Sequence, residues 1–183
     1  MYMGNGQGSN ARLTWFDRTG KELGVIGGSI TGSRVAISPD GRTVAFGDAT
    51  RDIWLHDIEK GTTSRFTFQR EGTRAYSPAW SPDGRSLIFS LQQEGKPWTL
   101  VKSMIGSGTS AELTTGTWGE TPRGIASPSW SRDGKYVVVR LNPAGATGTD
   151  LWMLRLEGAD PKPQPYVAGP ANESQPALSP SGE

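Results

Sequence analysis

The stretch SPAWSPDGRSLIFS, residues 77–90, decides the fold because it encodes a complete β-hairpin. Ser, Pro and Gly stand at the first, second and fourth positions of residues 81–84, where a type I turn favours them. After the turn, Leu87 and Phe89 alternate with Ile88 and Ser90 along a returning strand. We therefore predict two antiparallel strands joined by a tight turn.

The same unit occurs three more times, as VAISPDG at residues 35–41, PSWSRDG at 128–134 and PALSPSG at 176–182. The turn glycines, at positions 41, 84, 134 and 182, are 43, 50 and 48 residues apart. A period of roughly 40 to 50 residues with four strands per unit is typical of β-propeller blades. A sheet that is apolar on both faces must stack on neighbouring sheets, so the repeat predicts blades around a common axis.

The expected fold is therefore all-β, a β-propeller segment with about three complete four-stranded blades and a partial blade at each end. Fifteen strands are expected, which leaves the ring open. We interpret the segment as an arc of a larger ring, cut after the last turn; the alternative is a ring completed by association. The expected divisions are a disordered Gly-rich tail at residues 1–11, then a propeller segment at 12–183 with modules at 12–28 (partial), 34–68, 77–115, 127–168 and 175–183 (partial).

Composition excludes several classes of function. With 19 Lys and Arg against 18 Asp and Glu, the net charge is +1. The sequence contains no run of like charges of the kind that binds nucleic acids. The chain has no Cys, which excludes disulfides and thiolate zinc sites. No apolar run approaches the roughly 18 residues of a membrane span, and residues 1–10 lack the features of a signal peptide. We expect no nucleic-acid partner and no membrane span.

The repeated elements resemble a known family. The SPDGR turns, the DIW at residues 52–54, the acidic turn at 57–61 and the FT at 66–67 are similar to the TolB-type family of WD-like propeller repeats. LTWFDRTGKELG at residues 13–24 looks especially like the propeller at the carboxyl end of bacterial receptor-type serine/threonine protein kinases. That resemblance implies a bacterial, extracytoplasmic sensing or docking module, with any catalytic domain elsewhere in the parent chain.

The sequence departs from the family pattern in three places: Arg132 replaces an expected Pro, Ser181 replaces an expected Asp, and residues 96–98 are KPW in place of DIW. Type I turns accept Arg and Ser, so the fold prediction stands.

Six of the seven Trp residues recur at repeat positions, which predicts packing between blades rather than a carbohydrate site. They are Trp15, Trp54, Trp80, Trp98, Trp130 and Trp152. Trp118 has no counterpart and falls in a Gly-rich loop between two modules. In propellers such loops surround the mouth of the channel, where ligands dock. We predict a partner-binding cluster there, and the alternative is a solvated loop. The predicted cluster comprises Arg70, Arg74, Tyr76, Trp118 and Arg123.

No catalytic, metal or cofactor site is expected. His56 is the only His, no Gly-x-Ser-x-Gly turn occurs, and one His without Cys cannot build a zinc site. Turn chemistry explains Asp40, Asp83 and Asp133 without a metal.

Three functions remain open at this point. The first is a non-enzymatic propeller for protein interaction or ligand sensing, with a protein or peptide partner at the channel mouth. The second is the substrate-gating propeller of a prolyl-oligopeptidase-like serine peptidase. The third is a periplasmic TolB-like protein. Exposed blade edges predict self-association.

Overall fold

The computed structural model describes residues 11–30, 35–48, 51–113, 118, 123–143, 148–157 and 163–179. These residues contain strands and no helix. The strands are β1 (Ala11–Phe16), β2 (Glu22–Ile30), β3 (Val35–Ile37), β4 (Thr43–Gly47), β5 (Ile53–Asp57), β6 (Thr62–Arg65), β7 (Thr73–Trp80), β8 (Ser86–Gln93), β9 (Thr99–Met104), β10 (Ser110–Glu112), β11 (Gly124–Trp130), β12 (Tyr136–Asn142), β13 (Asp150–Arg155) and β14 (Pro163–Val167).

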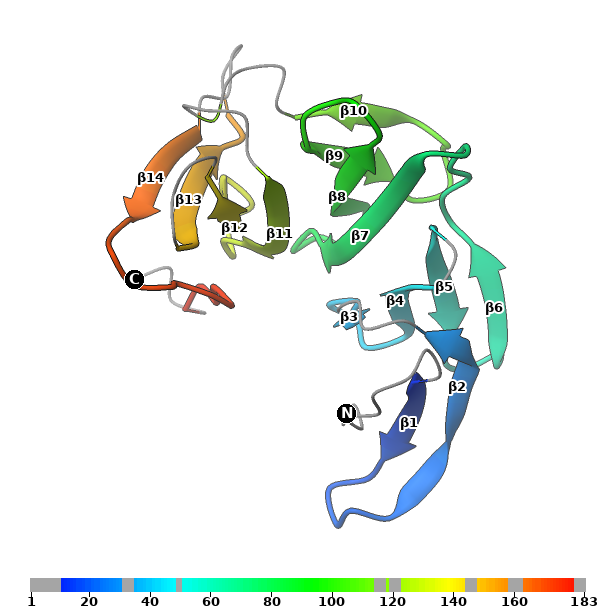
Figure 1. The fold of residues 1–183 in the computed structure, drawn as a ribbon. Helices are drawn as coiled ribbons and strands as arrows, with labels where there is room; N and C mark the ends of the chain where they lie inside the picture. Colours follow the sequence, from blue (N-terminus) through cyan, green and yellow to red (C-terminus); the bar gives the residue numbers. More distant parts are fainter. Residues whose placement is uncertain are drawn as a thin grey trace.

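The strands form one two-stranded sheet, β1-β2, and three four-stranded antiparallel sheets, β3 to β6, β7 to β10 and β11 to β14. In every sheet the strand order follows the chain, so each sheet is a meander. Figure 1 shows the sheets fanned about a common centre, with β3, β7 and β11 innermost and β6, β10 and β14 outermost. The arc is not closed, which confirms the predicted propeller with an incomplete ring.

The sheets β3 to β6 and β7 to β10 are apolar on both faces because their central strands alternate between two cores. On β8, Leu87 and Phe89 pack toward the β3 to β6 sheet, and Ile88 packs toward the β11 to β14 sheet. On β4, Val44 and Phe46 pack toward β1-β2, whereas Ala45 faces the other way. The six repeat tryptophans lie against these clusters, as predicted. Sheet stacking therefore holds the arc together.

The turns that identified the fold repeat the same hydrogen bonds in all three complete blades. In the central one, Gly84 N–H donates to the Ser81 carbonyl (2.9 Å), Ser81 Oγ donates to Asp83 Oδ1 (2.6 Å) and Ser86 N–H donates to Ser81 Oγ (2.9 Å). The turns at Ser38 and Ser131 have matching bonds. Gly84 has a φ of 69°, a left-handed conformation that favours glycine.

The strand expected at the start of the last partial module, residues 175–183, is not formed by the described residues. Residues 168–179 carry no strand among the described residues. Leu178 N–H donates to Ser129 Oγ (3.4 Å), and Gln175 has a φ of 57°, close to the φ of Ser77 and Ser127 at the same repeat position. The segment therefore repeats the bend of an innermost strand, although its described residues are not assigned to a strand. Residues 1–10 and 180–183, which include most of the predicted tail and the last turn, lie outside the described residues.

Candidate partner-binding surface

The candidate surface lies where the innermost strands begin, at the end opposite the Ser-Asp-Gly turns. β7 and β11 are the innermost strands of neighbouring sheets and lie side by side (Figure 1). Arg74 is the second residue of β7, and Arg123 directly precedes β11. The structure therefore brings Arg74 and Arg123 to the same end of adjacent strands.

A β-bulge sets the direction of the β7 side chains. Tyr76 pairs with Ser90 and Ala79 pairs with Ile88, so β7 has one residue more than β8 between these pairs. Ser77, at the bulge, has a φ of 50°. Because the extra residue shifts the alternation, Tyr76 and Arg74 lie on the face toward the β11 to β14 sheet, and Ala75 packs in the opposite core. β11 repeats this bulge at Ser127.

Tyr76 is half-buried and held from two sides. Its ring centroid lies 5.6 Å from that of Trp98, tilted by 32°. Its hydroxyl donates to Gln92 Oε1 at 3.3 Å. The Tyr76 ring is therefore held in one orientation, on the same face of β7 as the exposed Arg74.

Arg70 and Arg123 are exposed and have ordered backbones. The Arg70 carbonyl accepts the Thr73 N–H (3.0 Å), which closes the turn into β7, and Arg123 N–H donates to the Asn142 carbonyl (2.8 Å). We call Arg70, Arg74, Tyr76 and Arg123 the rim surface. Its role in binding a partner remains a prediction.

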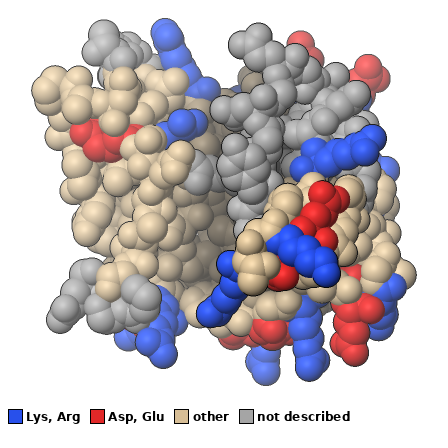
Figure 2. Space-filling view, turned by 90° about the horizontal axis from the view of Figure 1, so that it is seen from below, with Lys and Arg blue, Asp and Glu red and all other residues tan. Residues whose placement is uncertain are grey.

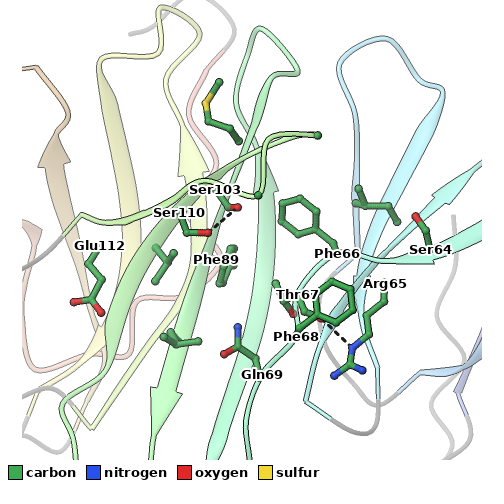
Figure 3. Close-up of a pocket in the computed structure, with 16 residues that line it drawn as sticks. Ser64, Arg65, Phe66, Thr67, Phe68, Gln69, Phe89, Ser103, Ser110 and Glu112 are labelled. Atoms are coloured by element: carbon green, nitrogen blue, oxygen red, sulfur yellow. Dashed lines mark hydrogen bonds between the residues drawn. The ribbon is translucent and has the colours of Figure 1, made fainter.

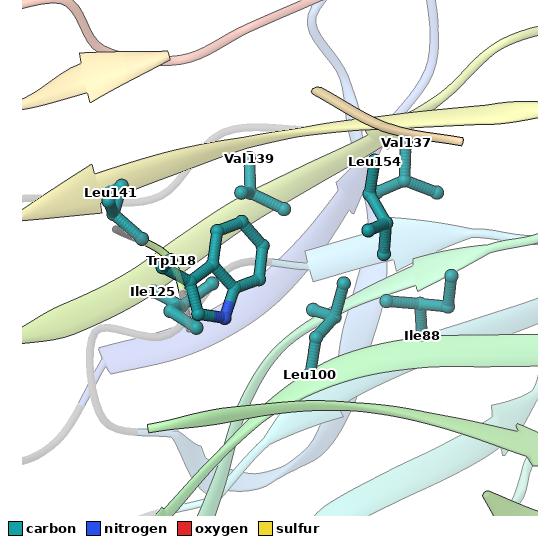
Figure 4. Close-up of a cluster of buried hydrophobic side chains, with 8 residues drawn as sticks. All are labelled: Ile88, Leu100, Trp118, Ile125, Val137, Val139, Leu141 and Leu154. Atoms are coloured by element: carbon teal, nitrogen blue, oxygen red, sulfur yellow. The ribbon is translucent and has the colours of Figure 1, made fainter. Parts of the chain in front are cut away.

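Trp118 is not part of an exposed cluster, contrary to the prediction. It is 3% exposed and packs among Ile125, Leu141 and Leu100 between two sheets (Figure 4). Its ring lies 6.3 Å from Trp152 in an edge-to-face arrangement. Burial of the large indole between two apolar sheet faces is more favourable than its exposure to water. Trp118 therefore packs inside the arc and does not present a contact to a partner.

The sequence analysis missed a buried polar network that joins the start of β5 to β6 and to the segment after β6. Asp52 is 1% exposed and accepts hydrogen bonds from Thr67 Oγ1 (2.8 Å), Gln69 N–H (2.8 Å) and Arg65 Nη2 (2.6 Å). Thr67 Oγ1 in turn accepts the Ile53 N–H (2.9 Å). In this blade the network accounts for the Asp of the DIW element and the Thr of the FT element. It fixes the connection from β6 to β7, which carries Arg70.

His56 and the turn aspartates, which were considered for catalysis and metal binding, form hydrogen bonds within the fold. His56 is buried on β5, with Nδ1 2.8 Å from Thr63 Oγ1. The Ser81 hydroxyl and, to a smaller extent, the Arg85 N–H donate hydrogen bonds to the Asp83 carboxylate. These bonds hold the pKa of Asp83 below its usual value of 3.8. Asp40 and Asp133 have lowered pKa values for the corresponding reasons. No group of three potential metal ligands occurs within the described ranges.

The face of the arc that is seen from below carries charges of both signs. Figure 2 views the arc from below and shows Lys and Arg interspersed with Asp and Glu, without a broad field of one sign. Leu23 and Val25 of β2 are exposed, and the predicted self-association through blade edges remains untested. The described part of the chain has no helix long and apolar enough to cross a membrane.

Comparison with known proteins supports the fold. No protein-family model matches the chain. The crystal structure of TolB from Acinetobacter baumannii superposes with a TM-score of 0.75 at 21% identity, covering 99% of this chain and 43% of that one. The chain has the fold of a TolB-type β-propeller.

Two further proteins show similarity. A structure from a study of two prolyl endopeptidases matches this TolB-type fold with a TM-score of 0.59 at 21% identity, over 89% of this chain and 27% of that one. A Bacillus subtilis (strain 168) protein named as the uncharacterized peptidase YuxL is 31% identical over 93 residues, 51% of this chain and 13% of its own length. The chain thus spans less than half the length of each of these proteins.

Proposed function

We propose that this TolB-type propeller arc is a non-enzymatic interaction module that contacts a protein or peptide partner through the rim surface. The observation that supports the proposal is that Arg74 and Tyr76 lie on one face of β7, and that Arg70 and Arg123 lie near the same end of β7 and β11. Exposed Arg and Tyr side chains on an ordered support are enriched where proteins bind one another. Because Trp118 is buried, the proposed contacts are the other four residues.

The partner's chemistry follows from the charges on the rim surface. The three Arg residues lie near the same end of two neighbouring inner strands, and each guanidinium group can bind a carboxylate in a bidentate manner. The partner is accordingly a protein segment that carries Asp or Glu close to an apolar residue. By its resemblance to TolB-type repeats, the parent is a bacterial protein with an extracytoplasmic propeller, such as a receptor-type serine/threonine kinase or a TolB-like protein.

Photo-crosslinking in the parent protein tests this proposal. A photoreactive phenylalanine analogue replaces Arg74, and a matched protein carries the analogue at Arg42, an exposed residue at the turn end. A crosslinked partner is expected from position 74 and not from position 42. Equal crosslinking from both positions, or none from position 74, rejects the proposal.

The alternative function is the gating propeller of a prolyl-oligopeptidase-like serine peptidase. Similarity to YuxL and to prolyl endopeptidase favours it. This function requires an α/β-hydrolase domain with a Gly-x-Ser-x-Gly nucleophile turn in the same parent protein. The sequence that flanks residues 1–183 in the reading frame distinguishes the two proposed functions. A hydrolase domain there supports the peptidase, whereas a kinase domain with a membrane span supports the interaction module.

A further inference from the structure

A groove opens between the outer parts of two neighbouring sheets, away from the rim surface. It has a volume of about 690 Å³, within the range of ligand-binding pockets. Figure 3 shows its walls, which come from β6 and the segment after it on one side and from β8, β9 and β10 on the other. None of the rim-surface residues lines it. The groove is therefore a separate feature of the arc.

The floor of the groove and part of its outer edge are apolar. Phe66, Phe89 and Val101 form part of the floor and belong to the core between the sheets. Phe68 and Met104 lie at the outer edge of the groove, and their side chains are 73% and 40% exposed. Exposed aromatic and Met side chains beside an apolar floor are the composition of a binding patch rather than of an ordinary surface.

Phe68 is held in place although it is exposed. The guanidinium carbon of Arg65 lies 4.9 Å from the centroid of its ring. Arg65 Nε donates to the Thr67 carbonyl (3.0 Å), and Arg65 Nη2 is paired with Asp52. Because the charge of Arg65 is already compensated by Asp52, this wall of the groove offers an oriented aromatic ring and no uncompensated cation.

The opposite wall offers hydrogen-bond acceptors. Ser110 and Glu112 lie two residues apart on β10, so both side chains are on the same face. The Ser110 hydroxyl donates to Ser103 Oγ (2.9 Å), which donates to the Thr109 carbonyl (3.4 Å), so both hydroxyl protons are used internally. Glu112 is exposed, and no ion pair joins it to another described residue. This wall therefore favours a cationic donor.

The outer edges of the groove suit an extended chain. β6 and β10 are the outermost strands of their sheets, and each pairs with a single strand in the described structure. All residues of both strands are exposed. An edge strand has backbone groups free to hydrogen-bond with an added peptide strand.

We propose that this groove binds an extended peptide segment that carries a large apolar side chain and, two residues away, a Lys or Arg. The apolar side chain packs between Phe66 and Phe68, and the cation pairs with Glu112 and Ser110. Spacing by two residues places both side chains on the same side of an extended peptide.

The test uses the 183-residue chain and a panel of fluorescent pentapeptides with blocked termini. In the panel, Phe, Leu or Trp stands two positions from Lys or Arg, in either order, and binding is measured by fluorescence anisotropy. At least one peptide is expected to bind with a Kd below about 1 mM, the weak end of measurable affinities. Replacement of its basic residue by Glu should weaken binding at least tenfold. The absence of binding across the panel, or equal binding of the acidic analogue, overturns the proposal.

Variants of the chain then locate the bound peptide. Glu112→Gln is expected to weaken binding about fivefold to tenfold, as the loss of one charged contact does. Phe68→Ser, at an exposed position that leaves the core intact, should weaken it to a similar extent. Glu59→Gln makes the same chemical change at an exposed residue outside the groove and should leave binding unchanged. If Glu112→Gln and Phe68→Ser bind as well as the unmodified chain, the peptide does not occupy this groove and the proposal fails.

A small aromatic amine distinguishes a peptide site from a small-molecule site. Phenethylamine supplies the aromatic ring and the cation without a peptide backbone. It is expected to bind at least tenfold more weakly than the best peptide, because it cannot pair with an edge strand. Equal affinity of phenethylamine rejects a peptide as the occupant.

Discussion

The two ends of the inner strands differ in how closely they repeat from one sheet to the next. At the turn end, the sheets that contain β3, β7 and β11 share one set of Ser, Asp and Gly hydrogen bonds with nearly equal lengths. At the rim end, β7 carries Arg74 and Tyr76, whereas β11 begins at Gly124 and has Trp118 packed nearby. At the turn end, the polar groups therefore hydrogen-bond within each hairpin. At the rim end, side chains are available for contacts with another molecule.

This difference indicates a division of roles. Repeated hydrogen bonds that close a hairpin stabilise the blade and leave few polar groups for a ligand. Side chains that differ between blades can fit one particular partner. The predictions below test this division, first by removing what supports the rim end and then by perturbing the turn end.

The largest effect is expected from Trp118→Ala. Removal of a buried indole leaves a cavity between two sheets and should lower the free energy of unfolding by about 3–5 kcal/mol. Urea denaturation measures it. Trp118→Phe, which retains an aromatic ring, should lose less than half as much. Loss of less than about 1 kcal/mol in the Ala variant would mean that the indole is not packed between the sheets.

The next effect is expected from Asp52→Ala. The substitution leaves Arg65 without its carboxylate and removes the acceptor of the Thr67 hydroxyl and the Gln69 N–H, which should destabilise the chain by about 2–3 kcal/mol. Asp150, at the same repeat position on β13, accepts no hydrogen bond at its carboxylate from another described residue. Asp150→Ala should therefore cost under about 1 kcal/mol in the same urea experiment. Equal losses would show that the network around Asp52 is not specific to its sheet.

The core of the fold was predictable from the sequence because its signals are local. A Ser, Pro, Asp and Gly turn determines a hairpin within a few residues, and alternation such as Leu87, Ile88 and Phe89 specifies a sheet that is buried on both faces. The repeat tryptophans were correctly assigned to packing for the same reason, since their position within the module was visible in the sequence.

The missed features depend on contacts between distant segments. Burial of Trp118 requires the faces of two sheets that lie far from it in the sequence, so its loop context suggested exposure instead. The bulges at Ser77 and Ser127 have a local signal, a Ser-Pro pair inside a strand, but the left-handed conformation of a Ser is uncommon. The groove beside Phe68 depends on the spacing between two sheets, which no single module encodes.

A smaller effect is expected at the turn end. Ser81→Ala leaves the Ser86 N–H without its acceptor and removes the hydroxyl donor to Asp83, and it should cost about 1–2 kcal/mol. Because the geometry repeats, Ser38→Ala and Ser131→Ala should give losses within about 0.5 kcal/mol of that value. Thermal unfolding of the three variants compares them directly. Widely different losses would contradict an equivalent role for the three turns.

The smallest effect concerns pH. The pKa values of Asp40, Asp83 and Asp133 are lowered in the folded chain, first by a Ser hydroxyl in each case. Their contribution to stability is therefore present above the unfolded value near 3.8 and is lost as the pH falls through the lower folded values. A variant with all three Asp replaced by Asn should show a shallower fall in its urea midpoint between pH 4.5 and pH 2.5. An unchanged pH dependence would show that these carboxylates are not stabilised by the turns.

The most direct test of the division between the two ends is a pair of triple variants in the parent protein. One carries Arg70→Ala, Arg74→Ala and Arg123→Ala, and the other carries Arg42→Ala, Arg85→Ala and Lys135→Ala, so both lose three positive charges. Affinity for the partner crosslinked at position 74 is measured by calorimetry. We predict at least a tenfold loss for the rim-surface variant and less than a twofold change for the turn-end variant. Equal losses in the two variants would contradict the account.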